Sequence, residues 1–220
     1  MSTILLIRHG ENDYVSKGRL AGRLPGIHLN GNGEKQAEEI ASKLSQSSIN
    51  KIYSSPLERC IETIQPLADK LNLSVVPREG LAEIDFGDWQ DKTLKQLHRR
   101  KLWKLVQSNP ARMQFPEGET FVEAQTRIIS ELESLNKEHN PKDLIACCSH
   151  SDPIRLALAY YIGTPLDLFQ RIVVFPGSIS TLHMGEFGVR ILNINYSLSH
   201  NPMHQMRGKR TSSKKHQTRN

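Results

Sequence analysis

The sequence predicts an α/β fold, a three-layer sandwich with a mostly parallel central sheet and helices on both faces. Short apolar runs alternate with amphipathic segments over the first three-quarters of the chain, and this alternation is typical of parallel sheets. The last quarter is rich in strand-forming segments, which predicts a β-hairpin added near the end. With 220 residues, 37% of them hydrophobic, the chain can bury one sizeable core.

The predicted strands are short, apolar and rich in β-branched residues. The first is closed by His9-Gly10, and a later buried run is closed by His150. The predicted strands cover residues 3–8, 51–53, 73–76, 143–149, 171–175, 179–184 and 189–195.

The predicted helices are recognised by their apolar stripes and their start signals. Residues 33–44 place their apolar side chains on one stripe, as an amphipathic helix does. Pro56 suits the first turn of a helix, and Thr120 with Glu123 forms a capping box. The predicted helices cover residues 33–44, 56–71, 93–107, 120–139 and a segment after Pro153 to about 162, while 11–32 and 81–89 are expected to be loops.

The basic charge of the chain is concentrated at its C-terminal end. There are 29 Lys and Arg against 23 Asp and Glu, a net charge of +6. Six basic and no acidic residues follow residue 195, so the preceding part is neutral. We therefore predict one domain over residues 1–200 and a basic, disordered tail over 201–220. Only this tail could attract nucleic acid, so nucleic-acid binding is disfavoured.

The cysteines and the N-terminus predict a cytoplasmic protein. Cys60, Cys147 and Cys148 are odd in number and two are adjacent, which does not make a disulfide framework. The first residues lack the basic start, long apolar middle and cleavage site of a signal peptide. No apolar stretch reaches the length of about 18 residues that a membrane span needs, so no membrane association is expected.

Two histidines follow predicted strands directly. His9 lies in Arg8-His9-Gly10 and His150 lies in Ser149-His150-Ser151. In an open α/β sheet, ligands bind at the carboxyl ends of the strands. We therefore expect both imidazoles to face one crevice, which Arg59, near the start of a helix after a strand, could also reach.

Four segments, in order along the chain, together resemble the histidine phosphatase superfamily, which includes the cofactor-dependent phosphoglycerate mutases. A lone Arg-His-Gly would be a weak signal, but four ordered blocks over three-quarters of the chain are a strong one. The blocks are Leu6-Ile7-Arg8-His9-Gly10-Glu11, the run from Tyr53 to Thr63, Leu81-Ala82-Glu83-Ile84-Asp85-Phe86-Gly87-Asp88-Trp89, and Ser149-His150 with Ile154-Arg155. The resemblance implies a phosphoglycerate mutase-like fold and a phosphomonoester substrate.

The resemblance also implies a role for each matching residue. His9 would be the nucleophile, because a neutral imidazole can attack phosphorus, and its other ring nitrogen should donate to a backbone carbonyl. Arg8 and Arg59 would bind the phosphate, since arginine matches phosphate bidentately. His150 would bind phosphate and stabilise the charge of the transition state. Glu83 would be general acid and then general base. No metal or other cofactor is expected, because no ligand-spaced group appears.

Several assignments stay open from the sequence alone. Asp85 lies two residues from Glu83 and could serve as the acid instead. Val15 stands where relatives often carry a phosphate-binding asparagine. Trp103 and Phe115 could line the substrate mouth, although packing is their more ordinary use.

Three further residues are candidates for substrate contact. Arg23 lies in the long loop after the first block and could touch phosphate or substrate. Ser151 and Asp152 stand where the family often has Gly-Gly. Asp152 could cap the following helix or contact a polar or cationic part of the substrate.

The predicted activity is metal-independent hydrolysis of a small phosphorylated metabolite through a phosphohistidine. A mutase-type phosphotransferase is the alternative, because mutases share this pocket and add basic residues from an insertion. The interval before the second histidine has no long insertion, although Arg99, Arg100, Lys101 and Lys104 could recognise an acidic substrate. A non-catalytic binding module is disfavoured, because all five implied catalytic and phosphate-binding residues are intact.

Overall fold

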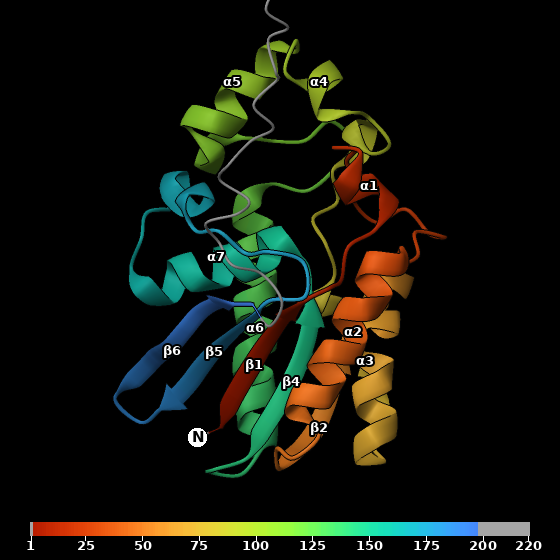
Figure 1. The fold of residues 1–220 in the computed structure, drawn as a ribbon. Coiled ribbons are helices and arrows are strands. Elements are labelled where there is room, and N and C mark those ends of the chain that lie inside the picture. The colour runs from red at the N-terminus through yellow and green to blue at the C-terminus, as the bar shows by residue number, and fades with distance from the viewer. Residues whose placement is uncertain (1, 198–220) are drawn as a thin grey trace, which may run out of the picture.

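A computed structural model describes residues 2–197, and its centre is a six-stranded sheet in the order β3-β2-β4-β1-β5-β6 (Figure 1). The first four strands in that order pair in parallel, and β5 and β6 are antiparallel additions at one edge. The fold is the predicted α/β sandwich. The strands are β1 (Thr3–Arg8), β2 (Ile49–Ser54), β3 (Val75–Pro77), β4 (Leu144–Ser149), β5 (Ile179–Gly185) and β6 (Gly188–Tyr196).

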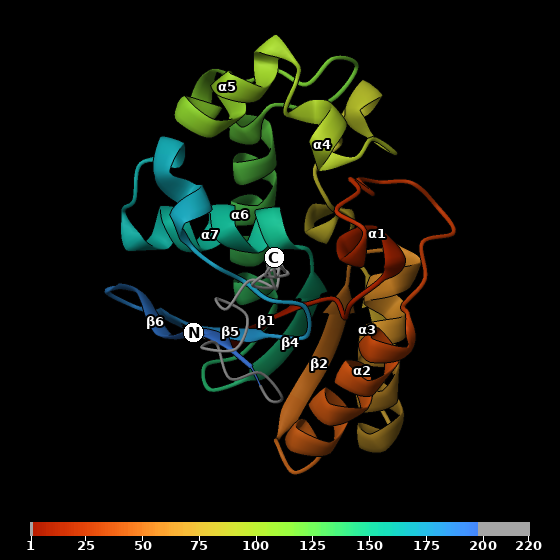
Figure 2. The same ribbon diagram turned by 45° about the horizontal axis from the view of Figure 1, so that its top comes forward.

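Helices cover both faces of the sheet (Figures 1 and 2). On one face lie α2 and α3, and on the other lie α6 and α7. The short α1 lies in the loop after β1, and α4 and α5 lie beyond the carboxyl ends of the strands. The helices are α1 (Asp13–Ser16), α2 (Gly31–Leu44), α3 (Glu58–Leu71), α4 (Leu94–Leu97), α5 (Lys101–Ser108), α6 (Phe121–Glu138) and α7 (Ser151–Ile162).

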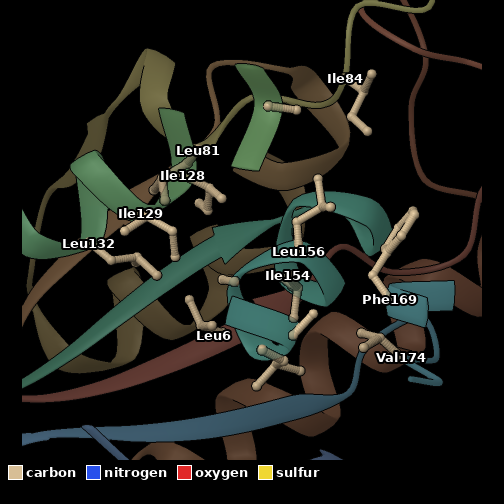
Figure 3. Packing of buried hydrophobic residues seen from close by; sticks show 14 of the residues in the cluster. Leu6, Leu81, Ile84, Ile128, Ile129, Leu132, Ile154, Leu156, Phe169 and Val174 are labelled. Atoms are coloured by element: carbon tan, nitrogen blue, oxygen red, sulfur yellow. The ribbon is translucent and has the colours of Figure 1, made fainter. Parts of the chain in front are cut away.

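The alternation of side chains along β1 divides the core into two clusters. Ile4 and Leu6 belong to the cluster under α6 and α7, which Figure 3 shows around Leu6, Ile128 and Ile154. Leu5 and Ile7 belong to the other cluster, under α2 and α3. Because successive strand residues point to opposite faces, one apolar strand fills both cores and is held in place from both sides.

Strand register brings three carboxyl ends together. Arg8 pairs with Ser149 across β1 and β4, and Ser54 pairs with Cys148 across β2 and β4. The residues after these strands therefore begin at the same edge of the sheet. Crossover connections in a parallel sheet leave such an edge open for a ligand.

One predicted helix is broken in the structure. The segment 93–107 forms α4 and α5 instead of one helix, because Arg100 takes an extended backbone conformation at the start of α5. The break lets His98 pack on Trp103, with ring centroids 4.2 Å apart. Such tertiary packing overrides helix propensity, which is weak over a few residues.

The predicted strand at 171–175 was wrong. In the described sheet this segment pairs with no strand. Arg171 instead ends the 3₁₀ turn Leu166–Arg171, and the residues after it run as a loop. Its Val174 carbonyl accepts a hydrogen bond from Arg8 Nη1 at 2.6 Å, so the loop holds a site residue.

The predicted domain boundary near residue 200 and the basic tail over 201–220 lie outside the described residues. Within residues 2–197, no helix is both long and apolar enough to cross a membrane. Cys60, Cys147 and Cys148 are free and buried thiols.

We predict that Gly33→Ala lowers the free energy of unfolding by about 2–3 kcal/mol. A Cβ atom on Gly33 would lie 2.1 Å from the carbonyl oxygen of Glu11, so the loop after β1 would have to move away from α2. Urea denaturation measures the change. The matched control is Gly31→Ala in the same helical turn, where nothing lies within 4 Å, and it should leave stability unchanged or raise it by up to about 1 kcal/mol. Equal stabilities of the two variants would contradict this account of the loop.

Candidate active site

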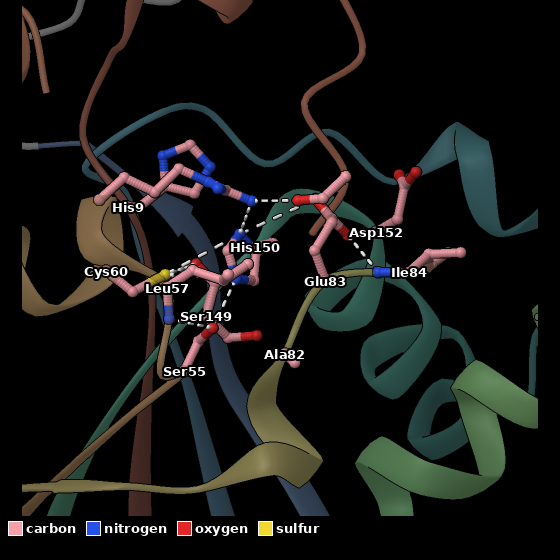
Figure 4. A network of polar contacts seen from close by, with 12 residues as sticks. His9, Ser55, Leu57, Cys60, Ala82, Glu83, Ile84, Ser149, His150 and Asp152 are labelled. Carbon is pink, nitrogen blue, oxygen red and sulfur yellow. Dashed lines mark hydrogen bonds and ion pairs between the residues drawn. The ribbon is translucent and has the colours of Figure 1, made fainter. Parts of the chain in front are cut away.

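The two predicted histidines face each other at the carboxyl ends of β1 and β4. Their ring centroids are 5.2 Å apart with an interplanar angle of 62°, and both rings are buried (Figure 4). His9 follows Arg8 at the end of β1, and His150 is the N-cap residue of α7. The strand register thus brings the two imidazoles together, as expected, although only His9 lines the cavity described below.

The ring of His9 is fixed in one tautomer. Its Nδ1–H donates to the carbonyl of Gly10 at 2.7 Å, since a carbonyl oxygen can only accept. Gly10 is held in turn by its own N–H, which donates to Thr63 Oγ1 at 2.9 Å. Burial, with Arg59 and Arg8 nearby, holds the pKa of His9 well below its usual value. At neutral pH, Nε2 therefore carries a free lone pair.

His150 is fixed in the opposite tautomer. Its Nδ1 accepts a hydrogen bond from Arg59 Nη2 at 3.1 Å, so its proton is on Nε2. Nε2–H then donates to Ser55 Oγ at 2.8 Å, and Cys60 Sγ lies 3.4 Å from the same nitrogen. Burial lowers the pKa of His150 well below its ordinary value, and the charge of Arg59 adds to this effect. The ring is therefore neutral in the free protein.

The guanidinium groups of Arg8 and Arg59 are each held by hydrogen bonds at one nitrogen only. Arg8 Nη1 donates to the Val174 carbonyl, and Arg59 Nη2 donates to the Gly22 carbonyl at 2.7 Å. Among residues 2–197, Arg8 Nε and Arg59 Nε and Nη1 are buried without a partner. Burial lowers the pKa of Arg8 to about 10, which keeps it charged at neutral pH. Buried charged donors without partners are costly unless an anion takes them up.

The Glu83 carboxyl group adjoins this positive pocket. Oε1 accepts a hydrogen bond from the Ile84 N–H at 3.0 Å, and Oε2 lies 3.9 Å from His150 Nδ1 (Figure 4). Burial, followed by the negative charge of Asp152, raises the pKa of Glu83 to about 7. Because the pKa of His150 is lowered and its ring is neutral, this contact is not an ion pair. The carboxyl can therefore hold a proton at neutral pH.

Asp85, the alternative acid, lies elsewhere. Its Oδ1 accepts from the Gly87 N–H at 2.9 Å, and it lines a separate surface hollow with Arg23 and Glu119. The geometry favours Glu83.

His9 lines a cavity of about 270 Å³, and the fully buried His150 lies behind this lining, against Arg59. Arg8, Arg59, Glu83, Ser151 and Asp152 line it as predicted. Several other residues line the cavity that were not predicted to do so, and the most relevant of these are Asn12, Tyr14, Arg19 and Arg155.

Asn12 and Arg155 are the missed residues with the clearest chemistry. Asn12 Oδ1 accepts from the Val15 N–H, while its buried Nδ2 has no partner in the described part of the chain. Arg155 Nη1 lies 3.1 Å from Asp152 Oδ1, and its Nε is also buried without a partner. Arg155 belongs to the fourth sequence block, and its i, i+3 spacing from Asp152 on one helix was a further signal that it reaches the same wall.

Two sequence expectations need correction. Arg23 does not line the cavity, because its Nε donates to the Glu83 carbonyl and its Nη2 pairs with Glu119 at 3.0 Å. It supports the loop that carries Glu83 instead of facing the phosphate pocket. Asp152 does not cap α7, since His150 is the N-cap residue and Asp152 lies in the first turn, paired with Arg155. A contact of Asp152 with substrate stays open.

The geometry and the sequence lead to one family. The sequence matches the histidine phosphatase superfamily, branch 1, over residues 4–197. The chain belongs to the histidine phosphatase superfamily.

Relatives in this superfamily include phosphatases and mutases. The chain is 29% identical to phosphoserine phosphatase 1 of Hydrogenobacter thermophilus, over 89% of this chain and 92% of the relative. It is 31% identical to a 2,3-bisphosphoglycerate-dependent phosphoglycerate mutase of Thermoplasma acidophilum, over 74% of this chain and 77% of the relative. The crystal structure of phosphoserine phosphatase from Entamoeba histolytica with 3-phosphoglyceric acid superposes with a TM-score of 0.80, at 26% identity, covering 90% of this chain and 98% of that one. This histidine phosphatase therefore acts on small phosphorylated metabolites, as a phosphatase or a mutase.

No metal site accompanies the histidines. Within residues 2–197, no group of three or more His, Cys, Asp or Glu side chains could hold a metal ion. The positive charge of the described site comes from Arg8 and Arg59, with Arg19 and Arg155 at its wall.

We predict that Glu83→Gln raises the free energy of unfolding by roughly 3 kcal/mol at alkaline pH. The pKa of Glu83 rises from 4.5 to about 7 on folding, so its ionisation opposes folding. The stability present below pH 4.5 is lost as the pH rises through 7, and an uncharged amide avoids that loss. Urea denaturation at several pH values measures the difference, which should grow between these two values and then level off. Glu186→Gln, on an exposed turn, is the control, and a pH-independent difference for Glu83→Gln would contradict the raised pKa.

Proposed function

We propose that this histidine phosphatase hydrolyses phosphomonoesters without a metal, through a phosphohistidine on His9. The observation that carries the proposal is the free Nε2 lone pair of a neutral His9 beside buried guanidinium groups whose N–H donors lack partners. A phosphate dianion would take up these donors, and it would lie against the nucleophile.

In the first step, Nε2 of His9 attacks phosphorus and the bond from phosphorus to the ester oxygen breaks. The protonated carboxyl of Glu83 gives its proton to the leaving alkoxide, which departs as the alcohol. Nδ1–H of His9 keeps its hydrogen bond to Gly10, so the ring stays oriented. Arg8 and Arg59 stabilise the charge on the phosphoryl oxygens, and His150 positions Arg59 by accepting its Nη2–H.

In the second step, the Glu83 carboxylate takes a proton from water as that water attacks phosphorus. The bond between phosphorus and Nε2 breaks, which returns neutral His9 and inorganic phosphate. The Glu83 carboxyl is again protonated, so the cycle closes without a further reactant.

We favour a phosphatase over a mutase because the basic cluster before the second histidine does not reach the pocket. The four basic residues of this cluster are exposed on or beside α5, and none of them lines the phosphate pocket: Arg99, Arg100, Lys101 and Lys104. A mutase would need such groups to retain a second acidic group of its substrate. Relatives named as phosphoserine phosphatases make O-phosphoserine the first metabolite to assay, and a phosphoglycerate mutase assay tests the alternative.

A cytoplasmic location and a basic tail over 201–220 stay predictions. The free, buried thiols of Cys60, Cys147 and Cys148 support a reducing compartment.

We predict that His9→Ala reduces hydrolysis of p-nitrophenyl phosphate at least about a thousandfold in the presence of a chelator. The reason is that no other described group combines a free lone pair with a place between Arg8 and Arg59. Initial rates measure the loss. His28→Ala, which removes an exposed imidazole outside the cavity, should keep the full rate. Activity that survives His9→Ala, or that the chelator abolishes in the unmodified protein, would contradict the proposal.

We predict that Glu83→Gln lowers kcat/KM for an alkyl phosphate at least about a hundredfold but for p-nitrophenyl phosphate only a few-fold. The alkoxide is a strong base and needs the proton, whereas p-nitrophenolate leaves without it. For the alkyl ester, kcat/KM of the unmodified enzyme should fall as the pH rises through about 7, since Glu83 loses its proton there. Asp85→Asn is the matched variant, and the same leaving-group pattern in that variant would transfer the acid role to Asp85.

A further inference from the structure

A second cavity opens from the wall of the phosphate pocket. It has a volume of about 310 Å³ and lies under α4 and α5, which are seen beyond the strand ends in Figure 2. The two cavities adjoin, because they share five lining residues: Leu20, Phe86, Leu94, Asp152 and Arg155. The mechanism proposed above does not use this second cavity.

Aromatic and aliphatic side chains form its walls. Trp89 and Trp103 stack with ring centroids 6.2 Å apart and an interplanar angle of 17°, and Phe115 meets Trp89 edge-on at 5.3 Å. Leu97 and Val106 complete the apolar lining from α4 and α5. Trp89 and Phe115 are almost fully buried, so the partly buried Trp103 offers the ring on which another planar group can stack.

The cavity is a partly open hollow rather than an enclosed void, so a ligand can enter it. Two polar features also point to a ligand. Trp89 is 1% exposed, yet its indole N–H has no partner among residues 2–197, and the buried Arg155 Nε at the junction also has none. A ligand with a hydrogen-bond acceptor would satisfy such a donor.

We propose that this cavity is the subsite for the alcohol portion of the substrate, and that it selects phosphomonoesters whose alcohol carries a planar, largely apolar group. This inference rests on the proposed function, and it names the class of phosphomonoester that the enzyme would hydrolyse. The phosphate lies at His9, the Asp152–Arg155 pair faces the polar linking atoms at the junction, and the apolar group stacks within the aromatic walls.

Hydrolysis of ethyl, n-butyl and 4-phenylbutyl phosphate tests the proposal, because the three leaving alcohols have similar basicity and differ mainly in apolar size. We expect kcat/KM to rise along the series by at least about tenfold, chiefly through KM, since a remote binding group acts mainly on affinity. A flat series would overturn the proposal.

Two substitutions on α5 separate the cavity from its surroundings. Gln107 is exposed at the rim and lines the cavity, whereas Lys104 is exposed on the same helix and does not. Gln107→Trp should plug the cavity and reduce the ratio of kcat/KM for 4-phenylbutyl to ethyl phosphate at least about tenfold, while Lys104→Trp should leave that ratio within about twofold. Equal ratios in the two variants would overturn the proposal.

Intrinsic fluorescence gives a readout that does not depend on turnover. The chain has two tryptophans, and both Trp89 and Trp103 line this cavity. In His9→Ala, 4-phenylbutyl phosphate should change the emission and ethyl phosphate should not. If no phosphomonoester is hydrolysed but 4-phenylbutyl phosphate alone causes this change, the subsite stands and the proposed hydrolysis fails. If ethyl phosphate is hydrolysed but the longer ester causes no change, the subsite fails and the hydrolysis stands.

Discussion

The parallel pairing of β1 with β4 is the constraint on which the site depends. Its register sets Arg8 opposite Ser149, so the next residues, His9 and His150, leave the sheet side by side. Buried apolar side chains on both faces of β1 fix this register, because a slip by one residue would exchange its two cores. The position of the imidazoles is thus determined by hydrophobic packing some distance from the chemistry.

Burial then sets the protonation states of the site. The same low-polarity surroundings that lower the pKa of both histidines raise the pKa of Glu83 to about 7. Without an anion, the pocket contains charged guanidinium groups with unused donors beside neutral bases and a carboxyl that can hold a proton. This arrangement is costly for the free protein and suits a dianionic ester, which supplies the missing charge and hydrogen bonds.

The sequence predicted the parts of this site that follow strand ends, and much less of what surrounds them. His9 and His150 could be predicted to meet because each follows a buried apolar run, and a carboxyl end has a known place in a parallel sheet. Arg23 was misplaced because a loop of that length has no periodicity to fix its direction. The break between α4 and α5, and with it the aromatic cavity, depends on contacts such as that of His98 with Trp103, which local propensity does not encode. The failure of 171–175 to join the sheet likewise depends on tertiary contacts, such as the hydrogen bond that the Val174 carbonyl accepts from Arg8.

The most direct test of the central claim is the identification of the phosphorylated atom. Rapid quenching of the enzyme with substrate under alkaline conditions, which preserve phosphohistidine, followed by peptide mass spectrometry and phosphorus NMR, would locate it. Because Nδ1–H of His9 is bound to the Gly10 carbonyl, the account predicts phosphate on Nε2 of His9 alone. Phosphate on His150, on Nδ1 of His9, or on no histidine during steady turnover would contradict it.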